Sequence, residues 1–169
     1  MTDVDPVARS RPIAKGTERV MLESMLDFYR ATVVNKVAGL TDAQAFTAAV
    51  APSVLTPATV VKHLVGTERF WFSIDFAGLD VIWPWPDDDL HGNFRVEPGD
   101  TLATIVDAYV GECANSRRAI RDAGLDDSAR GEGMDFTLRF ALLHLIEETA
   151  RHCGHLDLLR EATDGEVGV

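Results

Sequence analysis

The sequence has few cysteines and no long apolar segment. Its two cysteines, Cys113 and Cys153, are too few for a disulfide framework, which indicates a protein built for a reducing compartment. The opening stretch, MTDVDPVARSRPIAKG, has no apolar centre of the kind found in secretory signals. No run of about 18 apolar residues occurs, so no segment is expected to span a membrane. We therefore expect a cytoplasmic protein.

Basic side chains are also scarce relative to acidic ones. The chain of 169 residues has 16 Lys and Arg against 27 Asp and Glu, which gives a formal net charge of −11. A surface this acidic repels phosphate backbones and anionic membranes. Nucleic acid is therefore not expected as the main partner.

Strand patterns, hairpin turn signals and internal repeats are missing as well. Four segments instead carry apolar residues at spacings of three and four, which is typical of amphipathic helices. They cover about residues 22–37, 57–76, 101–123 and 135–164. This pattern predicts an all-α protein, a four-helix bundle.

Two helix starts carry capping signals. Thr56 can accept hydrogen bonds from the free N–H groups of the second helix, and Pro57 suits its first position. Thr41 and Gln44 have the spacing of a capping box, which predicts a short helical turn after the first helix.

The bundle is expected to form one domain over residues 16–165, preceded by a flexible tail at residues 1–15. A long segment, residues 78–99, joins the second and third helices and contains prolines and two tryptophans. Loops this long inside a compact domain tend to be functional or disordered, and the tryptophans argue against disorder.

One part of the fourth helix concentrates side chains that bind metals. His144 to Arg160, HLIEETARHCGHLDLLR, contains three of the five histidines. On a helical wheel with His144 at 0° and about 100° per residue, Glu148 falls at about 40°, His152 at about 80° and His155 at about 20°. These side chains share one narrow face beside the apolar stripe. A histidine and a glutamate one turn apart in such a place can bind one metal ion.

This pattern also has a plainer interpretation, because Glu and His are common on helix surfaces, where i, i+4 pairs support the helix. His63 favours the metal site. It lies among apolar residues of the second helix, and metal sites in bundles are built from inward side chains on facing helices. His63 alone would more often be a core histidine, but with Glu148 and His152 it completes a set of two imidazoles and one carboxylate.

Such a set is found in catalytic zinc enzymes, which leave the fourth coordination position open. Structural zinc usually has four protein ligands, mostly cysteines, and neither cysteine fits. Cys153 lies about 100° from His152 on the helical wheel, and Cys113 is on another helix. We expect Zn²⁺ or another divalent metal, because Fe²⁺ and Ni²⁺ accept similar ligands.

Two motifs, TVVKHLVGTERFWF (59–72) and TLRFALLHLIEETARHCGHLDLLREATDG (137–165), resemble the DinB/YfiT-like superfamily of metalloenzymes. In that superfamily one ligand is a histidine early in the second helix, which matches His63. The mycothiol-dependent maleylpyruvate isomerase branch has Glu and then His on the last helix, which matches Glu148 and His152. The resemblance covers about residues 15–165 and implies a DinB-like bundle with these three residues as metal ligands.

Two further histidines are open to several interpretations. His155 stands where many DinB proteins have Gln, and it is a candidate fourth ligand, outer group or proton shuttle. We expect it to line the pocket, which makes it a possible catalytic residue. His144 lies one turn before Glu148, and we expect it to support the site or the helix.

The resemblance implies a reaction that uses a thiol. Metal binding deprotonates a coordinating thiol, and the family suggests a small cofactor such as mycothiol. The thiolate would attack a small-molecule electrophile, by S-transfer or in a thiol-dependent isomerisation. A metal-dependent hydrolase and a non-catalytic bundle that binds metal or senses a ligand are the alternatives. Relatives of this kind also suggest a homodimer.

Four other residues are candidates for binding the cofactor. Arg139 and Arg151 could contact its polar groups, although exposed arginines are commonly part of the surface. Trp83 and Trp85 could form the wall of the pocket mouth, because ligand sites favour aromatic linings. Their alternative role is to close one end of the bundle.

Overall fold

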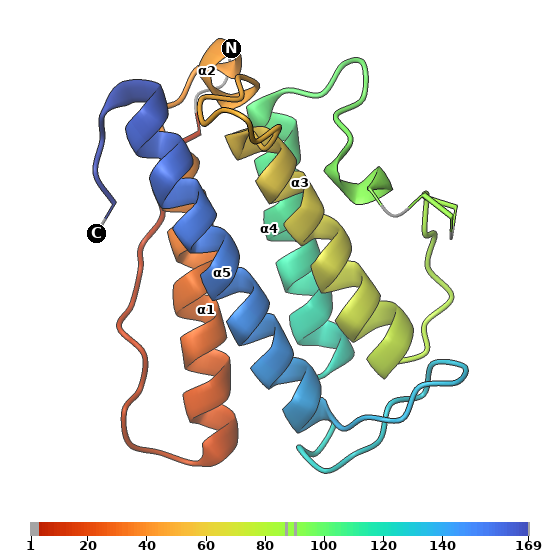
Figure 1. The fold of residues 1–169 in the computed structure, drawn as a ribbon. Coiled ribbons are helices and arrows are strands. Elements are labelled where there is room, and N and C mark those ends of the chain that lie inside the picture. The colour runs from red at the N-terminus through yellow and green to blue at the C-terminus, as the bar shows by residue number, and fades with distance from the viewer. Residues whose placement is uncertain (1–3, 87, 90, 169) are drawn as a thin grey trace.

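The computed structural model describes residues 4–86, 88–89 and 91–168, and it is helical. Four long helices form the body of the molecule, and three short helices lie between them (Figure 1). Within the described residues there is no strand, and Ser128 and Thr137 form an isolated bridge. The all-α four-helix bundle predicted from the sequence is confirmed. The elements are α1 (Glu18–Val37), α2 (Asp42–Ala45), α3 (Pro57–Glu68), η1 (Arg69–Phe76), η2 (Gly92–Phe94), α4 (Leu102–Ala119) and α5 (Leu138–Asp164).

Helices α1 and α5 lie side by side and run in the same direction (Figure 1). Ion pairs join them at both ends. Arg139 at the start of α5 pairs with Glu18 at the start of α1, and Lys36 near the end of α1 pairs with Asp157. These pairs hold the two helices in parallel register.

Helices α3 and α4 run parallel to each other and opposite to α1 and α5 (Figure 1). Lys62 of α3 pairs with Asp100 just before α4, and Arg69 at the start of η1 pairs with Glu112 of α4, at 3.0 Å. Because α3 and α4 are parallel, the chain must return along the whole bundle between them. The long connection predicted at residues 78–99 makes this return, and it lies beside α3 (Figure 1).

The predicted capping signals are present. Thr41 and Gln44 form a reciprocal capping box at α2, and Thr56 caps α3 with Pro57 in its first turn. Thr101 forms a similar capping box at α4. Each threonine satisfies backbone N–H groups that the first turn of a helix leaves free.

Three predicted helix ends are displaced. Helix α1 begins at Glu18 instead of about 22, because Thr17 caps it by accepting a hydrogen bond from Val20 N–H. Helix α4 ends at Ala119 instead of 123, where the side chain of Arg19 donates hydrogen bonds to the carbonyls of Ile120 and Ala123. Helix α5 begins at Leu138 instead of about 135, because Thr137 caps it by accepting a hydrogen bond from Phe140 N–H. Contacts from distant or neighbouring side chains therefore set these ends.

The second predicted helix extends to Phe76 as expected, but its winding changes at Arg69. From there η1 continues as a π-helix, a form that is frequent at functional sites. Within it, Trp71 packs on α5, with its ring centroid 4.2 Å from that of His144 and 6.1 Å from that of Phe140.

The buried core consists of two apolar clusters separated by a polar layer. Four residues make this layer, one from each long helix: Arg30, Glu68, Ser116 and Thr149. Each is buried and lies about one turn from members of both clusters. One cluster includes Val33, Leu64, Cys113 and Cys153, and the other includes Leu26, Phe72, Ile120 and Leu145.

The strongest interaction in this layer is an ion pair. The guanidinium of Arg30 donates two hydrogen bonds to the carboxylate of Glu68, at 2.7 and 2.6 Å. Burial lowers the pKa of Arg30, but the charge and hydrogen bonds of Glu68 outweigh it, so the pKa of Arg30 is raised and its guanidinium stays charged. Ser116 donates to the backbone carbonyl of Glu68 at 3.4 Å.

Residues 4–16 contain no helix or strand and run along α1. The N–H of Val7 donates to Asn35 at 2.7 Å, and the N–H of Ile13 donates to Ser24 at 2.9 Å. The predicted flexibility of residues 1–15 stays a prediction, and its residues 1–3 lie outside the described part of the chain.

Within the described residues, no helix combines the length and the apolar character that crossing a bilayer requires.

We expect Glu68→Gln to lower the free energy of unfolding by about 3–5 kcal/mol, because it leaves the buried charge of Arg30 without its partner. Chemical denaturation followed by circular dichroism measures the change. The matched control is Glu23→Gln, which breaks a more exposed pair with Arg19 and should cost less than about 1 kcal/mol. Equal losses in the two variants would contradict the assignment.

Candidate metal centre

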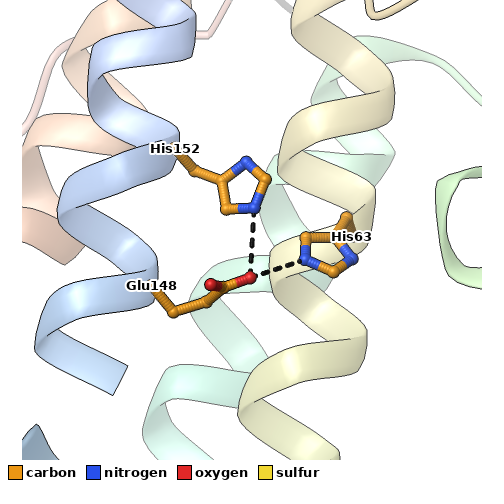
Figure 2. Close-up of side chains that lie close together, drawn as sticks. All are labelled: His63, Glu148 and His152. Carbon is orange, nitrogen blue, oxygen red and sulfur yellow. Dashed lines mark hydrogen bonds and ion pairs between the residues drawn. The ribbon is translucent and has the colours of Figure 1, made fainter. Parts of the chain in front are cut away.

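Three side chains from two helices meet at one point of the bundle (Figure 2). His63 comes from α3, and Glu148 and His152 lie one turn apart on α5. Glu148 Oε1 lies 3.1 Å from His63 Nε2 and 3.2 Å from His152 Nε2. The structure thus brings together the three residues that the sequence singled out as metal ligands.

The spacing of the three ligand atoms fits a metal ion, since all lie within 4.8 Å of one another. An ion with bonds of about 2.0–2.1 Å in tetrahedral geometry places neighbouring ligand atoms about 3.3 Å apart. The two distances to Glu148 Oε1 are close to this value. The triad could therefore hold a divalent ion with little movement of its side chains.

The ionisation of the triad also suits a cation. Burial and the neighbouring His63 lower the pKa of His152 to about 4, so its imidazole is neutral at pH 7. Burial raises the pKa of Glu148, but hydrogen bonds and charge from the two histidines outweigh burial and lower it overall. The site thus presents a neutral imidazole and a carboxylate, the forms that bind metals.

His155 lies against the outer nitrogen of His152. The two Nδ1 atoms are 3.3 Å apart, and the rings meet edge to face. When Nε2 of His152 keeps its lone pair for a metal, Nδ1 carries the proton and donates it to His155. His155 is therefore placed to fix the tautomer of His152, and it does not belong to the three-residue group around Glu148 Oε1.

Arg151 contacts the other oxygen of the glutamate. Its Nη1 lies 3.5 Å from Glu148 Oε2, and the same guanidinium pairs with Glu147. More than half of the Arg151 side chain is exposed at the edge of the site. This contact holds Glu148 by Oε2 and leaves Oε1 facing the two histidines.

Two other candidates lie away from the triad. Arg139 is nine residues before Glu148 and is engaged by Glu18 and Asp126. His144 stacks on Phe140, and its contact with Trp71 on η1 supports the packing of α5. The structure brings neither residue into the group around Glu148.

The two loop tryptophans form an aromatic wall next to α3. The ring of Trp83 packs between Phe70 on η1 and Trp85, with centroid distances of 5.2 and 4.8 Å. Trp85 in turn lies against Gly92 and Gly66. The long connection is thus docked on the helix that carries His63.

Two neighbours of His63 were not anticipated from the sequence. The ring of Phe94 stacks on the His63 ring, with centroids 4.0 Å apart and planes at 10°. The hydroxyl of Thr67 donates to the His63 carbonyl and lies 3.3 Å from His63 Nε2. Thr67 could have been found from its place one turn after His63, whereas nothing in the loop sequence points to Phe94.

Both cysteines are buried and free. Burial and the charge of Asp157 raise the pKa of Cys153 to about 12, and burial and Glu68 raise that of Cys113. Both thiols are therefore protonated at neutral pH, and neither belongs to the triad.

Comparison with known protein families gives a match over most of the chain. The family model described as Mycothiol-S-transferase matches residues 21–165, which include the four long helices from the first turn of α1 and the triad. No curated protein matches the chain significantly.

In the metal-free protein we expect the His152 ring protons to titrate in NMR with a midpoint of about 4. Because the folded pKa lies below the ordinary value of 6.5, the unfolded chain binds the extra proton between these two values. The stability contributed by neutral His152 is therefore present above pH 6.5 and lost as the pH falls towards 4. His152→Gln should lack this loss, and a midpoint near 6.5 contradicts the prediction.

We expect His155→Leu to weaken metal binding by about 10- to 100-fold, because it removes the acceptor for His152 Nδ1–H. His155→Gln keeps an acceptor oxygen and should bind close to the wild-type protein. Competition with a chromophoric chelator measures both affinities. If the Leu and Gln variants bind equally tightly, the hydrogen bond does not orient His152.

Proposed function

The chain belongs to the mycothiol-S-transferase family, and we propose that it is a zinc-dependent enzyme that transfers the thiol mycothiol to small electrophiles. The observation that carries the proposal is the convergence of His63 Nε2, Glu148 Oε1 and His152 Nε2 within 4.8 Å. Three protein ligands are the number that catalytic zinc sites use, which leaves one position for a substrate group.

The burial of both cysteines supports a reaction that uses an external thiol. Cys113 and Cys153 are buried and protonated, so the protein offers no reactive thiolate of its own. In a thiol-transfer reaction, the nucleophilic sulfur would then come from a small molecule. His63, Glu148 and His152 would hold a divalent ion, which would supply the positive charge that lowers the pKa of a thiol.

The residues of the site have separate tasks in this scheme. Glu148 and the neutral His152 would hold the ion together with His63, and His155 Nδ1 would accept a hydrogen bond from His152 Nδ1–H. Arg151 contacts Glu148 Oε2, the carboxylate oxygen that does not face the two histidines. In the transfer, a bond forms between sulfur and the electrophilic carbon, the bond from that carbon to its leaving group breaks, and the thiol proton is released.

The test compares wild-type protein with His152→Ala. Purified wild-type protein should contain about one metal per chain by elemental analysis, as expected for a single three-ligand site, and conjugate mycothiol to a bimane electrophile. His152→Ala should lose the metal and at least about 100-fold in rate, more than changes outside the ligand set cause. His144→Ala removes an imidazole from the same helix and should keep the metal.

Added thiol separates this proposal from the hydrolase alternative. Turnover that requires mycothiol and ends with a thioether supports transfer, whereas turnover of an ester or amide without thiol supports hydrolysis. Metal-loaded protein with neither activity would favour a bundle that binds metal without catalysis.

A further inference from the structure

The two histidines of the triad are held in different ways. His152 has an acceptor for its outer nitrogen in His155, at 3.3 Å. The outer nitrogen of His63, Nδ1, is buried and has no hydrogen-bond partner among the described residues. Histidines that bind metals almost always donate this second N–H to an acceptor, which fixes the ring. His63 lacks that support.

A stacked aromatic ring instead contacts one face of the His63 imidazole. The Phe94 ring lies 4.0 Å from the His63 ring and is tilted by only 10°, so the two rings overlap face to face. Phe94 also lies 6.3 Å from the ring of His152. A parallel stack restricts rotation of the imidazole about its χ2 bond and covers one of its faces.

Phe94 owes its position to a close contact within the loop. It ends η2, and η2 begins at Gly92, against which the Trp85 indole lies so closely that a Cβ at position 92 would overlap it. The same indole faces Gly66 of α3, where a Cβ would be 3.2 Å from Trp85 and 3.1 Å from Asn93. Trp85 is thus wedged between the loop and α3.

Gly92 is required for its lack of a side chain and not for its backbone conformation. Its φ is outside the positive range that favours glycine. Alanine at this position would therefore fit the backbone and disturb only the contact with Trp85. This makes the contact testable without changing any residue that touches the triad.

We propose that Phe94 is a positioning residue for the metal ligand His63, and that the wedge of Trp85 between Gly92 and Gly66 sets its position. The inference rests on the proposed metal site. It makes Trp85, Gly92 and Phe94 part of the binding machinery, in addition to their role in the connection. The stacked ring of Phe94 restrains the orientation of His63, whose Nδ1 makes no hydrogen bond among the described residues.

The first test replaces Phe94 and measures binding of Co²⁺ and Zn²⁺. Phe94→Ala removes the stack and should weaken binding of both ions by about 10- to 100-fold, with a changed Co²⁺ absorption spectrum. Phe94→Tyr keeps the stacked ring and should restore the wild-type spectrum and affinity. Thermal unfolding of the metal-free variants shows that both are folded, as expected for a side chain outside the apolar core.

The second test is a double-mutant cycle at the wedge. Gly92→Ala should weaken metal binding, although position 92 is not in contact with the ligands. In a Trp85→Ala background, Gly92→Ala should have no further effect, because the overlap has been removed. Additive effects, or a Gly92→Ala protein that binds metal normally, would overturn the role of Trp85.

The outcomes separate this inference from the proposed function. Wild-type protein that binds neither ion overturns the metal site and the inference together. Wild-type protein that binds them, with Phe94→Ala binding equally tightly and with the same Co²⁺ spectrum, overturns only the positioning role of Phe94.

Discussion

The buried ion pair between Arg30 and Glu68 is the interaction on which the geometry of this bundle depends. A slip of α1 or α3 by one turn would leave a charge in the core without its partner, which costs several kcal/mol. The pair therefore favours one register of α3 against α1, and ion pairs of Glu18 and Lys36 in turn join α1 to α5. His63 lies five residues before Glu68 on α3, so the same register sets the position of His63 along the bundle axis relative to Glu148. The polar layer of the core and the candidate metal centre are in this way consequences of one alignment.

The triad side chains and the protein's two thiols lie in different surroundings. The carboxylate and the imidazoles of the triad come from helices, where neighbouring contacts hold the side chains: Arg151 on Glu148, His155 on His152. The protein's two thiols, by contrast, are buried among apolar residues and stay protonated. Under the proposed function, a thiol from solution would react at the site while the protein's own thiols stay protonated. This agrees with membership of a family that is described by a small thiol.

Structural features that depend on helical periodicity could be predicted from the sequence, whereas features that depend on tertiary contacts were missed. The spacing of Glu148 and His152, and the capping signals at Thr56 and Pro57, are local and could be recognised directly. The convergence with His63 needed the fold, which the pattern of four helices supplied. The end of α4 was misplaced because it is set by Arg19, about a hundred residues earlier in the chain. Phe94 was missed because a loop aromatic carries no periodic signal.

The parallel arrangement of α3 and α4 has a consequence for how this family can diversify. The return path between them is compulsory, yet within the described residues none at 77–101 contributes to the buried hydrophobic core. Topology thus imposes a long segment beside the candidate metal centre, and few of its residues, such as Trp85, Gly92 and Phe94, make the close contacts described above. Elsewhere in this segment, substitutions and length changes would alter the surface beside α3 at small cost to folding. The helices that carry His63, Glu148 and His152 would stay unchanged.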